Sequence, residues 1–191
     1  MAIYKGRGDG RSLILNGHTD VVSPEPLARW SYDPWGAQIL DGRIYGRGAC
    51  DMKAGVAGMI KALEILLELN LAPAGDVILE VVVDEEASGN GTLASLLEGY
   101  NAEGAVFCEP TCCKIMPAHR GASFWKLKVV GKGAHAGVMH KGISAVDKAI
   151  ILYEAIQNLQ KTRNEKGRKH PLYRMYPTPA PLCTGKFHSG E

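Results

Sequence analysis

The residues of this chain best suited to chemistry are His18 and Asp20, which directly follow an apolar run at 13–15. That run predicts a buried strand over 12–16, and in an α/β protein the carboxyl end of such a strand faces the crevice where ligands bind. A histidine held there by an acidic residue two positions later is a suitable metal ligand with its supporting carboxylate. Taken alone, a His-x-Asp pair belongs more often to an ordinary polar loop, so its weight depends on the residues that follow.

Carboxylates recur at wider spacing, each beside an expected strand end or helix start, at Asp51, Glu85, Glu86 and Glu109. One histidine and several carboxylates that converge from separate strands are what a two-metal hydrolytic site needs. Zinc accepts this mixture of nitrogen and oxygen ligands and keeps one position open for water or substrate. A further carboxylate must stay unligated to take a proton from the water. Glu85 and Glu86 fit this division because neighbouring residues at a strand end point in different directions.

The elements that must position these residues alternate between strand and helix. Hydrophobic periodicity predicts strands over 12–16, 76–83 and 104–108, and helices over 54–70 and 92–97. Asp51 is placed to cap the first of these helices, and Asp41-Gly42 predicts a two-residue hairpin turn between 38–40 and 43–45. The alternation predicts an α/β fold with a largely parallel sheet flanked by helices.

The pattern changes near residue 117, where we place a domain boundary. Residues 1–116 form the expected α/β part, and residues 117–191 form a second, α+β part. In the second part, an alternating run over 124–130 predicts a strand with one exposed face, and an amphipathic run over 143–159 predicts a long helix.

The bulk composition is that of an ordinary soluble protein, with 191 residues, of which 46% are hydrophobic and 22% charged, and a net charge of +2. So small a charge gives no reason to expect a nucleic acid or an anionic membrane as partner, and no apolar run approaches membrane-spanning length. Residues 1–11 lack the apolar core of a secretory signal. The five cysteines have neither disulfide-framework nor zinc-knuckle spacing. These features predict a cytoplasmic protein with reduced thiols.

Several segments match a known pattern in order and separation. They are Gly-His-Thr-Asp-Val-Val at 17–22, Gly-Arg-Gly-Ala-Cys-Asp-Met-Lys-Ala-Gly at 46–55, Asp-Glu-Glu-Ala-Ser-Gly at 84–89 and Glu-Pro-Thr at 109–111, with later matches at 131–137 and 184–190. Together they resemble the co-catalytic zinc family of aminoacylases and carboxypeptidases, which includes enzymes of the acetylornithine deacetylase and succinyl-diaminopimelate desuccinylase type. The resemblance implies a zinc-exopeptidase-like catalytic domain over 1–116 and part of an inserted lid and dimerisation domain over 117–191.

The resemblance implies metal-binding roles for the matching residues. His18 would bind the first metal, and Asp20 would orient and polarise this histidine. Asp51 would bridge the two metals, Glu109 would complete the first site, and Glu86 would bind the second metal.

The remaining roles implied by the resemblance concern the reaction itself. Glu85 would act as the general base, and His135, on the lid, would help to stabilise the oxyanion in a partner subunit's site. The resemblance also implies a cis peptide bond between Asp51 and Met52. A terminal histidine of the second metal site would lie beyond Glu191, and we do not expect His188 to replace it.

The implied activity is metal-dependent hydrolysis of the amide bond of an N-acyl amino acid or small peptide. Zinc is the implied cofactor, with cobalt as an alternative ion, and the implied assembly is a homodimer formed through the lid. Two alternatives stay open: a dipeptidase or carboxypeptidase of the same family, and a non-catalytic remnant that binds a metal or dimerises. We expect the chain to be incomplete and, by itself, inactive or weakly active.

Overall fold

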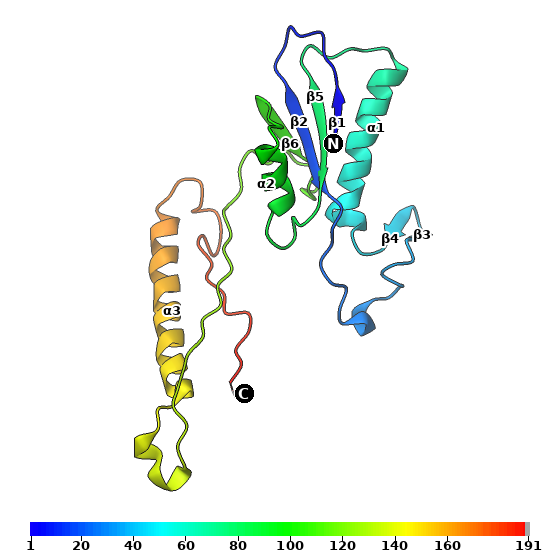
Figure 1. The fold of residues 1–191 in the computed structure, drawn as a ribbon. Helices are drawn as coiled ribbons and strands as arrows, with labels where there is room; N and C mark the ends of the chain where they lie inside the picture. The colour runs from blue at the N-terminus through cyan, green and yellow to red at the C-terminus, as the bar shows by residue number, and fades with distance from the viewer. Residues whose placement is uncertain (190–191) are drawn as a thin grey trace. The chain divides into compact units, whose positions relative to one another are not determined.

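The sheet that carries the predicted metal ligands lies in the first of two units (Figure 1). A computed structural model describes residues 1–189, and the chain divides into Met1–His119 and a unit that begins at Arg120. The last residue of the 184–190 match therefore lies outside the described residues. None of the helices in the described part of the chain is long and apolar enough to cross a membrane.

The first unit is built on a four-stranded sheet with the strand order β1-β5-β2-β6. β2 (Leu13–His18) runs parallel to both of its neighbours, β5 (Val77–Val82) and β6 (Gly104–Phe107). β1 (Ala2–Tyr4) runs antiparallel along the outer edge of β5. The prediction of a largely parallel sheet from the strand–helix alternation is confirmed.

The register of the sheet brings the ends of its strands to one level. His18, the last residue of β2, pairs with Val82, the last residue of β5. On the other side of β2, Asn16 pairs with Phe107, so Glu109 comes level with His18. Parallel strands present their carboxyl ends at the same edge of a sheet, where ligands bind. The residues that follow β5 and β6 are therefore delivered beside His18.

Helices cover both faces of this sheet. On one face, a side chain placed on Gly17 would meet residues of helix α1 (Ala54–Glu68) and of the turn before it. Val82 points to the other face, where its Cβ would lie 3.0 Å from a Cβ placed on Gly91 of helix α2 (Asn90–Leu97). The buried apolar side chains of the unit are Ile14, Met52, Val56, Met59, Val77, Ile78 and Val82.

The start of helix α1 differs from the prediction. We expected Asp51 to cap the helix, but no side chain caps α1, and the residue at its N-cap is Lys53. Asp51 belongs to the preceding turn η2 (Ala49–Lys53), where φ −117° and ψ 105° give it a non-helical backbone. The expected cap is wrong because the Asp51 carboxylate lies beside His18 instead of the helix amides. The peptide bond between Asp51 and Met52 is cis, as predicted.

The first turn of α1 also approaches the chain that leaves β6. A Cβ placed on Gly55 would lie 2.1 Å from the carbonyl oxygen of Cys108, a distance that no side chain tolerates. Glycine at this position therefore permits the contact between helix and strand. The contact holds the turn that carries Asp51 near the residue after Cys108, which is Glu109.

A small hairpin joins β2 to this turn in the sequence. β3 (Gln38–Leu40) and β4 (Arg43–Tyr45) pair antiparallel with the bounds that the sequence predicted. Asp41 and Gly42 have φ values of 50° and 71°, and positive φ at both central residues is what a type I′ turn requires. A short 3₁₀ turn, η1 (Leu27–Arg29), precedes the hairpin.

The second unit contains the 3₁₀ segment η3 (Ala136–Lys141) and the long helix α3 (Ala145–Arg168), which is capped by the Ser144 hydroxyl. The predicted helix over 143–159 is therefore present and extends further. The predicted strand over 124–130 is wrong, because no other described segment pairs with these residues. A strand needs a hydrogen-bonded neighbour, and the described part of the unit has only an isolated bridge between Lys132 and Ile143.

Candidate metal centre

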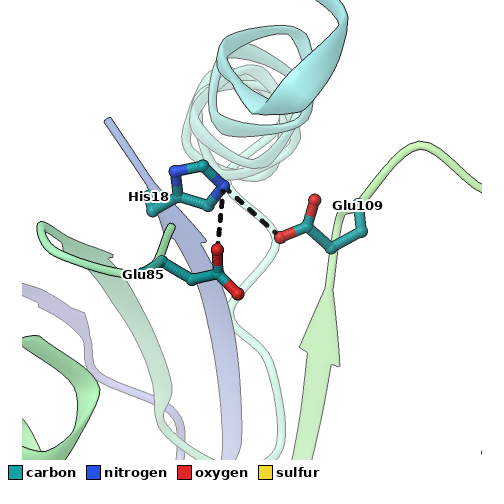
Figure 2. Close-up of side chains that lie close together, drawn as sticks. All are labelled: His18, Glu85 and Glu109. Carbon is teal, nitrogen blue, oxygen red and sulfur yellow. Dashed lines mark ion pairs between the residues drawn. The ribbon is translucent and has the colours of Figure 1, made fainter. Parts of the chain in front are cut away.

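His18 lies at the centre of the acidic cluster. Its side chain is only 1% exposed, and among the described residues its Nε2 atom has no hydrogen-bond partner. Carboxylate oxygens approach Nε2 from three sides: Asp51 Oδ1 at 3.3 Å, Glu109 Oε1 at 3.6 Å and Glu85 Oε2 at 3.7 Å. Figure 2 shows His18 with the two glutamates, which come from the ends of different strands. The buried Nε2 atom of His18 thus faces three carboxylates.

The structure brings together every predicted metal ligand of the first unit. Donor atoms of His18, Glu85 and Glu109 lie within 4.8 Å of one another, and so do those of His18, Asp51 and Glu86. These residues come from the end of β2, from η2 and from the segments that follow β5 and β6. Both sets share the histidine, and the predicted bridging residue, Asp51, belongs to the second set.

The other ring nitrogen of His18 is also engaged. Nδ1 lies 3.0 Å from the main-chain oxygen of Asp20 and 3.4 Å from the Asp20 carboxylate. A carbonyl oxygen can only accept a hydrogen bond, so Nδ1 carries the proton and Nε2 of the neutral ring keeps a free lone pair. A metal-binding histidine typically donates its second N–H to a carbonyl or carboxylate in this way.

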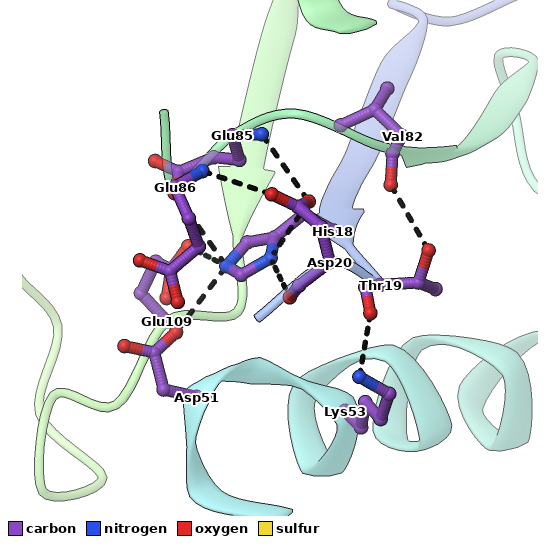
Figure 3. Close-up of polar contacts among 9 residues, drawn as sticks. All are labelled: His18, Thr19, Asp20, Asp51, Lys53, Val82, Glu85, Glu86 and Glu109. Atoms are coloured by element: carbon purple, nitrogen blue, oxygen red, sulfur yellow. Dashed lines mark hydrogen bonds and ion pairs between the residues drawn. The ribbon is translucent and has the colours of Figure 1, made fainter. Parts of the chain in front are cut away.

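The Asp20 carboxylate has a second task that the sequence did not predict. It accepts hydrogen bonds from the main-chain N–H groups of Glu85, at 3.3 Å, and Glu86, at 3.2 Å (Figure 3). Burial acts to raise the pKa of Asp20, but these two N–H groups outweigh it, and the pKa is lowered. The ionised carboxylate therefore anchors the segment that holds Glu85 and Glu86.

The electrostatics of the cluster favour a bound cation. The pKa of Glu109 is raised, first by burial and then by the negative charge of the neighbouring Asp51. Burial acts to lower the pKa of His18, but the Asp20 carbonyl and the surrounding carboxylates outweigh it, so its pKa is raised. In both groups the shift favours the protonated form.

The donor set fits a divalent metal ion. The main evidence for this fit is His18 Nε2, which has no partner among the described residues although a buried polar atom normally has one. One imidazole nitrogen with several carboxylate oxygens is a combination that zinc accepts. The negative charge of the carboxylates would be balanced by such an ion.

Thr19 and Lys53 belong to the site although the sequence did not single them out. The Thr19 N–H donates to the main-chain oxygen of Val82 at 3.0 Å, and the Lys53 ammonium donates to the Thr19 oxygen at 2.6 Å. Figure 3 shows the Lys53 contact, together with a hydrogen bond from the Thr19 hydroxyl to the same Val82 oxygen at 3.4 Å. A signal for Lys53 was present, since it lies two residues after Asp51 in the 46–55 match.

His135 belongs to the second unit, at the N-cap of η3. Its Nδ1 accepts a hydrogen bond from the Gly137 N–H at 3.1 Å. Because Nδ1 is the acceptor, the proton of the neutral ring is on Nε2. The imidazole is exposed, so this N–H group is available to a ligand.

Comparison with known proteins identifies related sequences over most of the chain. A model of the family described as peptidase family M20/M25/M40 matches residues 14–169. A succinyl-diaminopimelate desuccinylase of Rhodospirillum centenum is 35% identical over 179 residues, which cover 88% of this chain and 46% of the relative. The corresponding enzyme of Cupriavidus necator is 34% identical over 151 residues, which cover 74% of this chain and 39% of the relative. The chain thus spans less than half the length of these curated relatives.

Among solved structures, an M20 family metallo-carboxypeptidase of Sulfolobus solfataricus is similar, with a TM-score of 0.49 and 25% sequence identity. The similarity covers 56% of this chain and 24% of that protein.

Proposed function

The chain belongs to peptidase family M20/M25/M40, and on that premise we propose that it forms the metal-binding part of a hydrolase that cleaves the amide bond of an N-acyl amino acid. The observation that carries the proposal is the unpartnered, buried Nε2 atom of His18, faced by carboxylates from three segments. The names of the two relatives support a substrate of the N-succinyl diamino acid class, with N-acetyl amino acids as the next candidates.

The proposed ligands divide into two sets. His18, Asp51 and Glu109 would hold one ion, and Asp51 and Glu86 would hold a second. Zinc is the proposed ion and cobalt the alternative; when bound, such an ion polarises the amide carbonyl and makes water more acidic. Asp20 holds His18 through its main-chain oxygen and the glutamate pair through its carboxylate.

Glu85 is the proposed general base. Its Oε2 lies 3.7 Å from His18 Nε2, beside the ligand set, and its side chain is 47% exposed. A carboxylate in this position can take a proton from the attacking water at Oε2 and pass it to the leaving amine nitrogen. Its exposure leaves it accessible to water, whereas His18 is enclosed.

His135 is the proposed donor to the substrate. Its Nε2–H group can donate a hydrogen bond to the carbonyl oxygen as negative charge develops there, which is the task of an oxyanion hole. The donor is fixed because Nδ1 is occupied by the Gly137 N–H. We further propose that the second unit is the lid through which the protein forms a homodimer, which sedimentation analysis would test.

The proposed function is tested on the protein in its full-length form. Bound zinc is measured by mass spectrometry, and turnover is measured with N-succinyl-diaminopimelate, N-acetylornithine and a dipeptide. We expect zinc in the protein and amide hydrolysis of an acylated substrate, both lost in His18→Ala. Preferred cleavage of the dipeptide would indicate a dipeptidase, and metal binding without turnover of any substrate would indicate a non-catalytic protein.

A further inference from the structure

Lys53 reaches from η2 to the turn after β2. Its ammonium group donates a hydrogen bond to the main-chain oxygen of Thr19 at 2.6 Å (Figure 3). This distance is at the short end for a bond with a charged donor, the class in which hydrogen bonds are about twice as strong as neutral ones. The contact joins the segment of Asp51 to the segment that holds both His18 and Asp20.

The accepting oxygen, that of Thr19, is placed where it can affect the orientation of the His18 ring. The Thr19 carbonyl and the Asp20 N–H belong to one peptide group, which is planar. Fixing the oxygen therefore fixes the orientation of the chain as it enters Asp20. The main-chain oxygen of Asp20 accepts a hydrogen bond from His18 Nδ1–H at 3.0 Å, and this bond sets the direction of Nε2.

The same turn is held on its other side by β5. The Thr19 N–H donates to the Val82 oxygen at 3.0 Å, and the Asp20 carboxylate accepts the N–H groups of Glu85 and Glu86. The contacts with β5 and with the segment after it therefore relate His18, Asp20, Glu85 and Glu86 to one another. Asp51 is on a separate segment, and the Lys53 contact ties that segment to the turn.

The course of the Lys53 side chain shows why a long side chain is needed. It passes over Gly48, where an added Cβ would lie 2.9 Å from Nζ and 3.5 Å from Cδ of the lysine. The backbone N–H of Lys53 donates to the Gly48 oxygen at 3.0 Å. The backbone of Lys53 thus closes the η2 turn onto Gly48, while its ammonium group extends to Thr19.

From these contacts we infer that Lys53 is a positioning residue that holds the His18–Asp20 turn and Asp51 in register for metal binding. The inference rests on the proposed function, because it assigns Lys53 a task at that metal centre. It adds a residue that does not itself contact the ion.

Lys53→Met tests the inference, because methionine keeps most of the side-chain stem and removes the ammonium group. Lys53→Arg keeps a cationic donor, and Lys61→Met is the matched control. Lys61 lies on α1 and forms ion pairs with Glu64 and Glu68 at 3.1 and 3.3 Å. Lys61→Met therefore also removes an ammonium group together with its contacts. Zinc affinity is measured by competition with a chromophoric chelator, and the exchange of the Thr19 amide is measured by NMR in the metal-free protein.

We expect Lys53→Met to weaken zinc binding about 10–100-fold, the usual effect of removing a group that supports a metal ligand. Thr19 amide exchange should become faster, Lys53→Arg should restore much of the affinity, and Lys61→Met should bind zinc as the unaltered protein does. Unchanged zinc affinity and unchanged Thr19 exchange in Lys53→Met would overturn the inference about Lys53 but not the proposed function. If the unaltered protein binds zinc no better than His18→Ala, the proposed function fails, and the inference fails with it.

Discussion

At the scale of single residues, the two nitrogens of His18 have different surroundings, and this difference defines the site. Nδ1 is held by the main chain of Asp20, whereas Nε2 faces carboxylates and has no partner among the described residues. Burial removes water as an alternative partner, so the free lone pair is directed at the place where a cation would be held. Burial of Glu109, with the negative charge of Asp51 beside it, raises the pKa of that carboxyl.

Glu85 and Glu86 are adjacent in the sequence but are proposed to do different work, and paired substitutions separate them. In the full-length protein, Glu85→Gln should lower kcat by about 10²–10⁴-fold with nearly unchanged zinc content, because glutamine cannot accept the proton of water. Glu86→Gln should instead lower zinc occupancy at the second position. Steady-state kinetics and metal analysis check both, and exchanged effects would show that base and ligand have been assigned the wrong way round.

At the scale of elements, the site depends on how closely helix α1 approaches the end of β6. Gly55 permits that approach, because a Cβ there would overlap the Cys108 carbonyl oxygen. Asp51 and Glu109 lie on either side of this contact. Their separation is therefore set by helix packing and not by the local sequence around either residue.

Two glycines on α1 allow this dependence to be measured. Gly55→Ala should lower the free energy of unfolding by about 1–3 kcal/mol, as overpacked sites do. Gly58 has open space around its Cβ position, so Gly58→Ala should raise the free energy of unfolding by about 1 kcal/mol through helix propensity. Urea denaturation followed by circular dichroism distinguishes them. Equal stabilisation by both would mean that α1 does not press on Cys108.

The start of β5 provides a pH-dependent contact far from the metal centre. The Lys5 ammonium bonds to Asp76 at 2.7 Å and, with the Gly6 N–H at 2.9 Å, lowers the pKa of that carboxyl below its ordinary value of 3.8. A lowered folded-state pKa means that the stabilisation is complete above the unfolded-state value and is lost as the pH falls through the folded-state value.

Asp76→Asn should therefore lower the thermal unfolding midpoint near neutral pH, and its effect should shrink at an acidic pH below the lowered pKa, where the unaltered carboxyl is also protonated. Asp9→Asn is the control, because the Asp9 carboxylate forms an exposed ion pair with Arg7 at 3.5 Å, and such pairs contribute little. Equal loss of stability at both pH values would contradict the proposed charge contribution of Asp76.

At the scale of the whole molecule, the two proposed cation positions have unequal numbers of ligands in these 191 residues. The first has His18, Asp51 and Glu109, the usual three protein ligands of a catalytic zinc. The second has two carboxylates, Asp51 and Glu86. We therefore expect the expressed chain to bind one zinc ion tightly and a second weakly in a calorimetric titration. Two equally tight sites would show that another residue of the chain completes the second position.

The sequence alone predicted the secondary structure of the first unit better than that of the second. In the first unit, apolar periodicity and the Asp41-Gly42 turn predicted β2, β5, β6, the hairpin and helix α1, because these patterns indicate which face of a local element is buried. The antiparallel edge strand β1 was not predicted. In the second unit, the helix was predicted but the strand over 124–130 was wrong. Alternation indicates that a segment can form a strand, whereas a strand exists only where another segment pairs with it.

The sequence by itself determined which residues could serve at the site and in which order they occur along the chain, because residue type and short-range spacing are local properties. Only the tertiary structure decided their mutual arrangement. The β2–β5–β6 register places His18 level with Glu109, and Asp51 turns to His18 instead of capping α1. Distances between segments far apart in sequence depend on packing and register, which no local pattern records.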